Sequence, residues 1–489
     1  MYHPPSNRKQ IIRRIAVYSL MSAVTVGLVV VLVFIMLGYQ FNRSDGKIEQ
    51  GGLTQFDSRP VDAKVTIDGV SLGTPTPSKA TMTAGSHFVS MKREGYKEWQ
   101  KSVKVVPGSV LWLNYVRLIP NELKPASVAH FPVISSTAAS PDTKWMAIKE
   151  DPATPSIRTA DISQDDVKLK ELGLPADSYT HPSEGRTQAF SVEKWDPGSR
   201  YVLVKHTYND AKVEWMVVDT QNVVLTKNIT TLLGIEASKV VFSNSNSQIL
   251  YAQIGSDVRQ IDLGAATLSR PLITNVAEFS LYDTSVIAYT TLRDAAGTRT
   301  VGYYKDGAEK PSVLRSYTDD GQPPLHVAIS KYFNDMFVAI AYGDTIHIVR
   351  GDLPTNNASI VLAPSATTTF TMPGGVQYLS MMTKGRFVMA QTGPSFMMHD
   401  IELAKTTSTT LKGTTEVTKE LAWLDKYMLW SDRDNMLRLY EFDGANQHDI
   451  MPVVSGFTPT LGVDGKYLYA VTKAADNQYH LSRVRLILP

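Results

Sequence analysis

The chain has 489 residues, of which 43% are hydrophobic, so it is long enough for one large domain or for two or three ordinary domains with buried cores. It contains no cysteine, which excludes disulfides, thiolate metal sites and cysteine nucleophiles. The formal net charge is only +2, and no segment carries the dense basic face that binding to nucleic acid requires.

The first expected element is an uncharged, mostly aliphatic run of 23 residues from Ile15 to Leu37. At about 1.5 Å per residue, a helix of this length crosses a hydrocarbon core of roughly 30 Å. A cleaved signal peptide is the alternative, but its apolar region would be shorter, and the nearest small-residue cleavage pattern, Ser44-Asp45-Gly46, lies well beyond the run. The sequence therefore predicts a retained transmembrane helix.

The charges on the two sides of this run predict its orientation. Residues 1–14 contain four basic residues and no acidic one, whereas Arg43 and Lys47 on the far side are offset by Asp45 and Glu49. Basic flanks stay on the cytoplasmic side. We therefore expect a cytoplasmic tail at 1–14 in a cell membrane, a linker at 38–51, and the bulk of the chain outside the cytoplasm.

Within the run, Ser19, Ala23 and Gly27 recur every four residues. Such a stripe of small residues lets two transmembrane helices approach closely, although many stripes have no function. A homodimer through this stripe is an expectation of the sequence.

Residues 52–120 are expected to form a small all-β domain. Val65-Thr66-Ile67 and the stretch from His87 to Met91 alternate with the period of two that strands show. Turn pairs such as Asp68-Gly69 and Pro107-Gly108 separate the strands. Trp99 and Trp112 are expected in its core.

Several segments of this module resemble the PEGA domain family: Ser58 to Val65, Ile67-Asp68-Gly69, Gly73-Thr74-Pro75, Ala84-Gly85-Ser86-His87 and Glu94 to Trp99. The resemblance implies a compact β-sandwich-like module of surface and envelope proteins, a binding or spacing element without catalytic residues. The name-giving tetrapeptide is Pro60-Val61-Asp62-Ala63, with Asp62 where the family has glycine. If that glycine serves an unusual backbone angle, the first turn here should differ.

The module carries a net charge of +4, and the chain from Asn121 onward carries −6. Two consecutive strands hold a set of basic residues: Lys92, Arg93, Lys97, Lys101 and Lys104. These residues could contact anionic lipid headgroups or wall polymers. Alternatively, the lysines keep an edge strand soluble.

After residue 120 the chain settles into a repeat of a polar turn followed by an aromatic or branched strand. The leading strand residues fall at positions 145, 201, 249, 286, 337, 387, 427 and 467, with an average spacing of about 46 residues. A second strand follows each first one and tends to end in an apolar residue and a charge: Ala160-Asp161, Val218-Asp219, Ile261-Asp262, Val349-Arg350, His399-Asp400, Tyr440-Glu441 and Val484-Arg485. Such paired hairpins are typical of the middle of a four-stranded blade.

Blades must stack radially because neither face can be buried alone, so residues 121–489 are expected to form a β-propeller. Eight units predict eight blades, and seven would remain if one pair closes the ring. The motif from Trp195 to Tyr201, Trp-Asp-Pro-Gly-Ser-Arg-Tyr, resembles the TolB-like and WD-type propeller repeats. The predicted fold is thus an all-β ectodomain, a small sandwich plus a propeller, behind one transmembrane helix.

Catalytic motifs do not emerge from the sequence. It lacks repeated sialidase boxes, the Gly-x-Ser-x-Gly hydrolase elbow and a His-Glu-x-x-His zinc motif. Asp432-Arg433-Asp434-Asn435 hints at calcium, but a polar hairpin turn is expected at that place in any case. No catalytic residue, cofactor or metal is therefore predicted.

The function expected from these features is that of a bacterial, membrane-anchored scaffold of the cell envelope. Its propeller would bind an envelope protein or a wall glycan without catalysis. One alternative is an envelope glycan-processing enzyme that uses acidic residues at the propeller axis. Another is a self-assembling component of a surface layer.

Overall fold

The computed structural model describes residues 8–36, 38–42, 47–282, 286–318, 321, 323–351, 353, 367–382, 385–414, 419–475 and 477–489. The chain separates into two compact units, residues 1–122 and residues 123–488. The first seven residues of the expected cytoplasmic tail and the charged flank at 43–46 lie outside the described residues.

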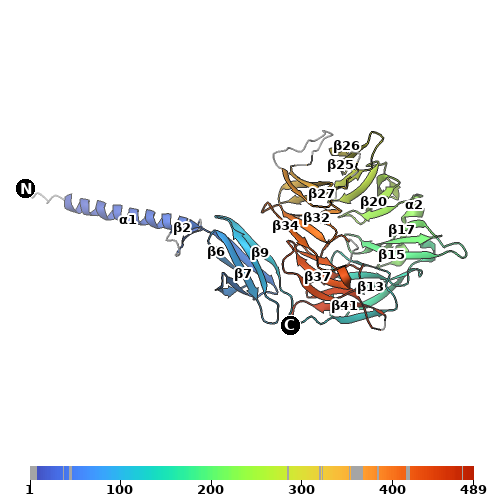
Figure 1. Cartoon of the computed structure of the whole chain (residues 1–489), viewed down its shortest axis with the longest axis horizontal. Coiled ribbons are helices and arrows are strands. Elements are labelled where there is room, and N and C mark those ends of the chain that lie inside the picture. The colour runs from blue at the N-terminus through green and yellow to red at the C-terminus, as the bar shows by residue number, and fades with distance from the viewer. Residues whose placement is uncertain are drawn as a thin grey trace, which may run out of the picture. The chain divides into compact units, whose positions relative to one another are not determined.

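The first unit begins with a single long helix, α1 (Arg8–Met36), which Figure 1 shows in dark blue. Its segment Ile11–Met36 is long and apolar enough to cross a membrane, by length and composition. A Cβ added at Gly27 would meet no atom within 4 Å, so the small-residue face is open. Dimerisation through that face stays a prediction.

The expected linker is a β-hairpin rather than an extended spacer. Strands β1 (Tyr39–Asn42) and β2 (Lys47–Gln50) pair antiparallel, with Tyr39 opposite Gln50. The Gly51 amide then donates to the Gly38 carbonyl at 2.8 Å. The chain therefore leaves the helix, makes the hairpin and returns to the end of the helix.

Two packed sheets form the module after the hairpin, which confirms the predicted sandwich. One sheet has the order β6-β3-β9 and the other the order β5-β4-β7-β8. The strands are β3 (Gly52–Arg59), β4 (Lys64–Ile67), β5 (Val70–Pro75), β6 (Ser78–Met82), β7 (Gly85–Lys92), β8 (Trp99–Val105) and β9 (Val110–Arg117). Their inner faces bury Phe56, Met91 and Trp99.

Two sequence expectations about this module fail. Trp112 is 43% exposed, because along the edge strand β9 it alternates with the buried Leu113 and lies on the outer face. Asp62 adopts a left-handed φ of 65°, so the residue at the glycine position keeps an angle that glycine favours. Aspartate tolerates this angle better than most residues, and the expected departure of the turn is not needed.

The second unit contains eight four-stranded antiparallel sheets within its described residues. The first four are β11 to β14 (Ser136–Ala139, Trp145–Lys149, Ser156–Asp161, Lys168–Gly173), β15 to β18 (Gln188–Trp195, Tyr201–Tyr208, Lys212–Asp219, Lys227–Asn228), β19 to β22 (Lys239–Phe242, Ile249–Ile254, Asp257–Asp262, Thr267–Leu268) and β23 to β26 (Val276–Leu281, Val286–Thr291, Thr298–Lys305, Ser312–Thr318). The others are β27 to β30 (Leu325–Tyr332, Asp335–Tyr342, Thr345–Arg350, Thr367–Thr371), β31 to β34 (Tyr378–Met381, Phe387–Thr392, Ser395–Asp400, Lys405–Thr410), β35 to β38 (Ala422–Trp423, Met428–Ser431, Met436–Glu441, His448–Pro452) and the closing sheet. Short helices interrupt them: η1 (Ala176–Ser178), η2 (Val223–Leu225), α2 (Ile229–Leu233) and η4 (Arg433–Asn435).

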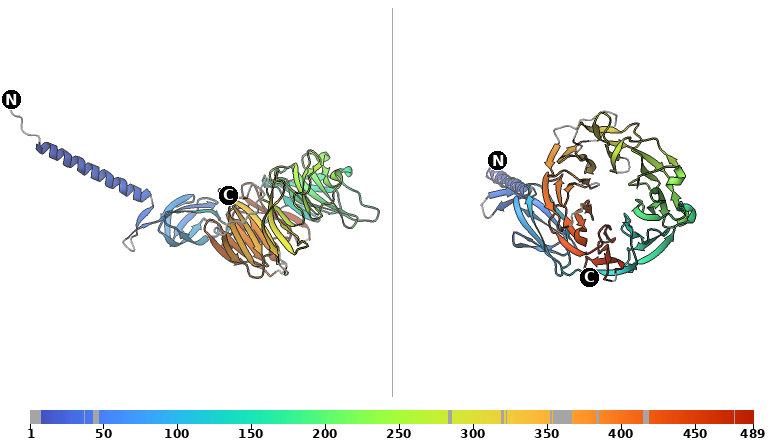
Figure 2. Two further views of the ribbon diagram at one scale, coloured as in Figure 1. Left: turned by 90° about the horizontal axis from the view of Figure 1, so that it is seen from above. Right: turned by 45° about the vertical axis from the view of Figure 1, so that its right-hand side comes forward.

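The sheets are arranged as a ring, which the right panel of Figure 2 shows face on. The ring is closed by a sheet that joins the two ends of the unit. Its order is β10-β41-β40-β39, with β10 (Ala126–Phe131) from the start of the unit beside β39 (Thr460–Leu461), β40 (Tyr467–Lys473) and β41 (Tyr479–Arg485) from its end. Because this sheet joins the two ends of the unit and closes the ring, the second unit is a β-propeller.

The repeat read from the sequence corresponds to the second and third strand of each sheet. Six of the eight second strands begin at the predicted leading residue, whereas β28 begins at Asp335 and β36 at Met428. All seven predicted strand ends coincide with the ends of third strands. The prediction that these hairpins form the middle of a blade is confirmed.

Side chains of neighbouring sheets meet in the space between them. Trp195 is 2% exposed and lies in one cluster with Ala147, Ile157 and Val204. Its Nε1 donates to the Ala138 carbonyl of the adjacent sheet at 2.8 Å. This tryptophan of the repeat motif therefore packs between neighbouring sheets.

Candidate binding site on the inner strands

The charges that the repeat places at the ends of third strands serve the fold. Asp219 Oδ1 accepts from the amides of Gln221 and Asn222 at 3.0 and 3.2 Å, and its carboxylate pairs with Arg200. Asp400 accepts from two following amides and pairs with Arg386 in the same way. These carboxylates hold the turn after the strand, so they are engaged before any ligand arrives.

A buried, hydrogen-bonded histidine–glutamate pair also belongs to the middle strands. The side chains of His206 on β16 and Glu214 on β17 are fully buried, and Nδ1 lies 2.7 Å from Oε1. Burial raises the pKa of Glu214, but hydrogen bonds from His206, Asn228 and Thr180 outweigh it and lower that pKa to about 2. The Phe190 ring stacks on His206 with 4.0 Å between centroids. This pair is closed to solvent and reads as structural.

Five charged or titratable side chains on the first strands of the sheets, or just before one, have a different setting. In the seven sheets whose four strands are consecutive in the chain, the first strand is the innermost, and neighbouring first strands such as β11 and β15 or β27 and β31 contact one another. We call these five the inner-strand cluster: Lys194 on β15, Lys239 on β19, Glu278 on β23, His326 on β27 and Glu420 just before β35. Five different sheets thus contribute one residue each.

His326 and Glu278 form the centre of the cluster. His326 Nδ1 lies 3.0 Å from Glu278 Oε2, and its Nε2 lies 3.2 Å from the Val376 carbonyl of the next sheet. The hydrogen bond with His326 holds the pKa of Glu278 below its usual range, against the effect of burial. The Glu278 side chain nevertheless remains 61% exposed.

Glu420 is positioned by its backbone rather than through its carboxylate. The buried Gln391 on β32 accepts from the Leu421 amide at 2.7 Å, and its amide group donates to the Lys419 carbonyl at 2.7 Å. Burial within the ring and the nearby charge of Glu278 raise the pKa of Glu420. Within the described part of the chain, no side chain is bonded to this carboxylate, and Glu420 is exposed.

Lys239 supplies the opposite charge. Its Nζ donates to the Phe279 carbonyl at 3.1 Å and stands 4.4 Å from the centroid of the Phe279 ring. Desolvation lowers the pKa of Lys239, Glu278 opposes this effect, and Lys194 adds to it. The cluster therefore offers both signs of charge to a ligand inside the ring.

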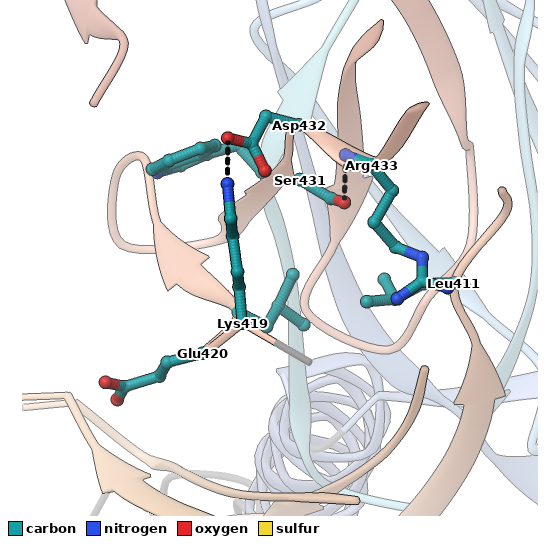
Figure 3. A pocket seen from close by; sticks show the side chains of 8 residues that line it. Leu411, Lys419, Glu420, Ser431, Asp432 and Arg433 are labelled. Atoms are coloured by element: carbon teal, nitrogen blue, oxygen red, sulfur yellow. Dashed lines mark hydrogen bonds and ion pairs between the residues drawn. The ribbon is translucent and has the colours of Figure 1, made fainter. Parts of the chain in front are cut away.

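A small pocket lies beside Glu420, and Figure 3 shows Lys419 reaching Asp432 across it. Its volume is about 40 Å³, which is room for a few water molecules and not for a substrate. Asp432 Oδ2 accepts from Lys419 Nζ at 3.0 Å and from the Gly456 amide at 2.7 Å. Burial raises the pKa of Asp432, but the hydrogen bonds together have the larger effect, so its pKa is lowered.

Asp432 also belongs to the segment Asp432-Arg433-Asp434-Asn435, whose sequence hints at calcium. Asp432 is held by Lys419, and Asp434 accepts from the Thr414 amide at 2.7 Å, so the two serve separate partners. The segment is the turn of the hairpin between β36 and β37. Among the described residues, no group of three or more potential metal ligands is found.

The structure does not bring the five predicted basic residues of the sandwich to one face. Lys101 is on the inner face of β8, where its Nζ stands 4.9 Å from the Tyr115 ring centroid. Arg93 donates to the Val61 carbonyl at 2.6 Å, and Lys97 is half-buried before β8. Lys92 and Lys104 are exposed on the outer face, at opposite ends of the β7–β8 pair. Their role in contacts with lipid or wall stays a prediction.

Residues 54–118 match the PEGA domain family, so the sandwich is a PEGA domain. No curated relative matches the chain in sequence. In structure, it is similar to the C-terminal WD40 domain of Sif2 (TM-score 0.47, 11% identity, 75% of this chain and 98% of the other) and to the Dos1 propeller (0.47, 12%, 74% and 95%). It is also similar to an oligogalacturonate lyase in complex with manganese (0.39, 12%, 75% and 98%). All three scores lie below 0.5, so these similarities carry no argument about function.

Sequence reasoning missed the whole inner-strand cluster. Its members lie in five separate stretches, and none is part of a motif. One feature of the sequence could have indicated these residues. Each is a charged or titratable residue in the segment before a repeat hairpin, where the repeat pattern contains no recurring position for a charge.

Proposed function

We propose that the protein is a membrane-anchored scaffold of a bacterial cell envelope. Its N-terminus would be cytoplasmic, and its propeller would bind a protein or a glycan outside the cytoplasm without catalysis. The apolar helix and its basic flank support the anchoring. The PEGA domain and the propeller are both consistent with a binding role.

The observation that carries the binding role is the inner-strand cluster. Carboxylates of the repeat, such as that of Asp219, accept hydrogen bonds from the amides of the following turn. By contrast, Glu420 has no bonded partner among the described residues, and Glu278 is largely exposed. A carboxylate without a bonded partner can accept charge-assisted hydrogen bonds from a cationic group of a ligand. Lys239 and Lys194 would meet anionic groups of the same ligand.

A second candidate, a glycan-processing enzyme, is favoured by one observation. The pKa of Glu278 is lowered and that of Glu420 is raised, and two carboxylates with opposite shifts are the usual pattern of a base and a general acid. We place it second because Glu278 is already held by His326 and is well exposed. Self-assembly as a surface layer remains a third hypothesis, without a structural observation in its favour.

Sedimentation with isolated cell-wall sacculi separates these functions. The full chain in nanodiscs would be pelleted with sacculi at low and high salt, and soluble wall fragments would be analysed. Salt-sensitive pelleting without fragments supports the scaffold. Release of fragments that stops in Glu420→Gln supports the enzyme, whereas absence of both redirects the search to a protein partner by cross-linking.

A further inference from the structure

A group of exposed apolar side chains lies on the PEGA domain at the end nearest the helix. It consists of the exposed Val106, Val110 and Trp112 together with the half-buried Leu53, and we call this set the membrane-proximal apolar face. Val106, Val110 and Trp112 are 49%, 44% and 43% exposed. Leu53 and Val110 are ladder partners on neighbouring strands, so they share one face of the sheet.

Hydrogen bonds tie this face to the end of the helix. Gly51 donates to the Gly38 carbonyl at 2.8 Å, and Gly108 donates to the Gly51 carbonyl at 2.9 Å. Leu53 donates to the Ser109 carbonyl at 3.0 Å. The turn from Val106 to Ser109 is therefore two hydrogen bonds away from Gly38, and the hairpin β1–β2 adds no spacing.

The position of the helix end relates this turn to a bilayer. The 26 residues from Ile11 to Met36 extend about 39 Å at 1.5 Å per residue, whereas the hydrocarbon core is roughly 30 Å thick. Gly38 then falls in the headgroup layer, which is roughly 5 to 8 Å deep on each side. Along β9, at about 3.3 Å per residue, Val110 lies roughly 7 Å and Trp112 roughly 13 Å from Gly108.

We propose that the membrane-proximal apolar face docks on the lipid bilayer with β9 inclined to the membrane normal, so that Val106 is deepest, Val110 is next and Trp112 lies at the outer boundary of the headgroup layer. The chemistry fits a lipid surface: tryptophan prefers this layer, and Lys79 lies in the same cross-strand row as Trp112, through Gln55. The proposal rests on the membrane anchoring proposed above. It makes the PEGA domain a platform on the bilayer rather than a stalk.

Site-directed spin labelling tests the docking, and the absence of cysteine makes single-cysteine variants specific. Val106→Cys, Val110→Cys and Trp112→Cys would carry a nitroxide in the full chain in nanodiscs with anionic lipid. The readout is the ratio of collision with oxygen to collision with a water-soluble nickel chelate. Val61→Cys is the matched control, since Val61 is 46% exposed and follows the opposite end of β3, roughly 20 Å away at 3.3 Å per residue.

The docking predicts a ratio at Val106 and Val110 that is several-fold above that at Val61 and falls toward Trp112. Leu28→Cys on the helix distinguishes failure of the docking from failure of the membrane anchoring. If the label at Leu28 contacts lipid but Val106 and Val110 match Val61, the docking is overturned and the anchoring stands. Low access to both reagents at Val106 would also overturn it, because protein would then cover the face. If Leu28 is open to water, the anchoring itself fails.

Discussion

Charged side chains on the middle strands of the propeller differ in their contacts from those on the inner strands. In the middle strands, Glu214 is paired with His206, and Asp219 holds a turn. On the inner side, Glu420 is fixed only through its backbone, and Glu278 stays exposed beside His326. The repeat therefore builds the frame with its own charges, and the residues outside the repeat are the ones left for a ligand.

The largest effect is expected from the middle strands. Glu214→Gln removes a buried charge and leaves His206 without its partner, which should cost roughly 3 to 5 kcal/mol of unfolding free energy. Denaturant unfolding of the full chain measures it. Glu184→Gln, an exposed change in the preceding loop, is the control. Equal stability of the two variants would show that the buried pair does not stabilise the frame.

The same residue gives a pH dependence with a defined sign. The pKa of Glu214 is about 2 in the folded chain, below its ordinary value of 4.5, so its contribution is present above pH 4.5 and is lost as the pH falls toward 2. At about 1.4 kcal/mol per unit, the wild type should lose about 3 kcal/mol in this window that Glu214→Gln does not lose. Parallel curves for the two proteins would contradict the assignment.

Gln391→Leu changes a middle strand but is expected to affect the inner strands as well, because Gln391 holds the backbone on both sides of Glu420. The substitution leaves the buried Leu421 amide and the partly buried Lys419 carbonyl without their partners, at a cost of roughly 2 to 4 kcal/mol, and it releases Glu420. Retention on the partner should fall although no charge is lost. A destabilised variant that binds normally would show that the position of Glu420 is unimportant.

Glu420→Gln should separate binding from stability. Burial and Glu278 raise the pKa of Glu420, so its charge is unfavourable at neutral pH, and its removal should leave stability within about 0.5 kcal/mol or raise it slightly. Partner retention should fall several-fold. A clear loss of stability would place Glu420 in the frame instead.

A further small effect is expected in the hairpin between β27 and β28. Phe333 is 79% exposed and has a φ of 52°, an angle that costs a bulky residue about 1 kcal/mol and suits glycine. Phe333→Gly should therefore raise stability by about 1 kcal/mol or less, measured by unfolding. A destabilised variant would mean that its ring contact with Tyr332 outweighs the backbone strain.

The sequence predicted the frame well because ladder pairing forces a local pattern. Trp145 is opposite Asp161, Tyr201 is opposite Asp219, and in every sheet of the ring an apolar or aromatic residue faces a charged one at this place. The packing of Trp195 follows from the same pattern. No local pattern encodes the inner-strand cluster, since only closure of the ring brings Lys194 and Glu420 into one enclosure.

The wrong expectation for Trp112 had a readable signal. Trp112 alternates in phase with Asn114 and out of phase with the buried Leu113, so the period of two already assigned it to the outer face of β9. The general preference of tryptophan for the interior concealed this. The expected basic stripe failed to form one face for the same reason, because Lys101 and Lys104 are an odd number of residues apart on one strand.

The most direct test compares retention of charge variants on sacculi. Lys239→Gln and Glu420→Gln change the inner strands, and Lys168→Gln and Glu171→Gln make the same changes on the outermost strand β14. The account predicts weaker retention for the two inner variants only, with unchanged thermal midpoints and without release of wall fragments. Equal retention of all four variants would contradict a binding site on the inner strands, and fragment release abolished by Glu420→Gln would contradict a protein without catalysis.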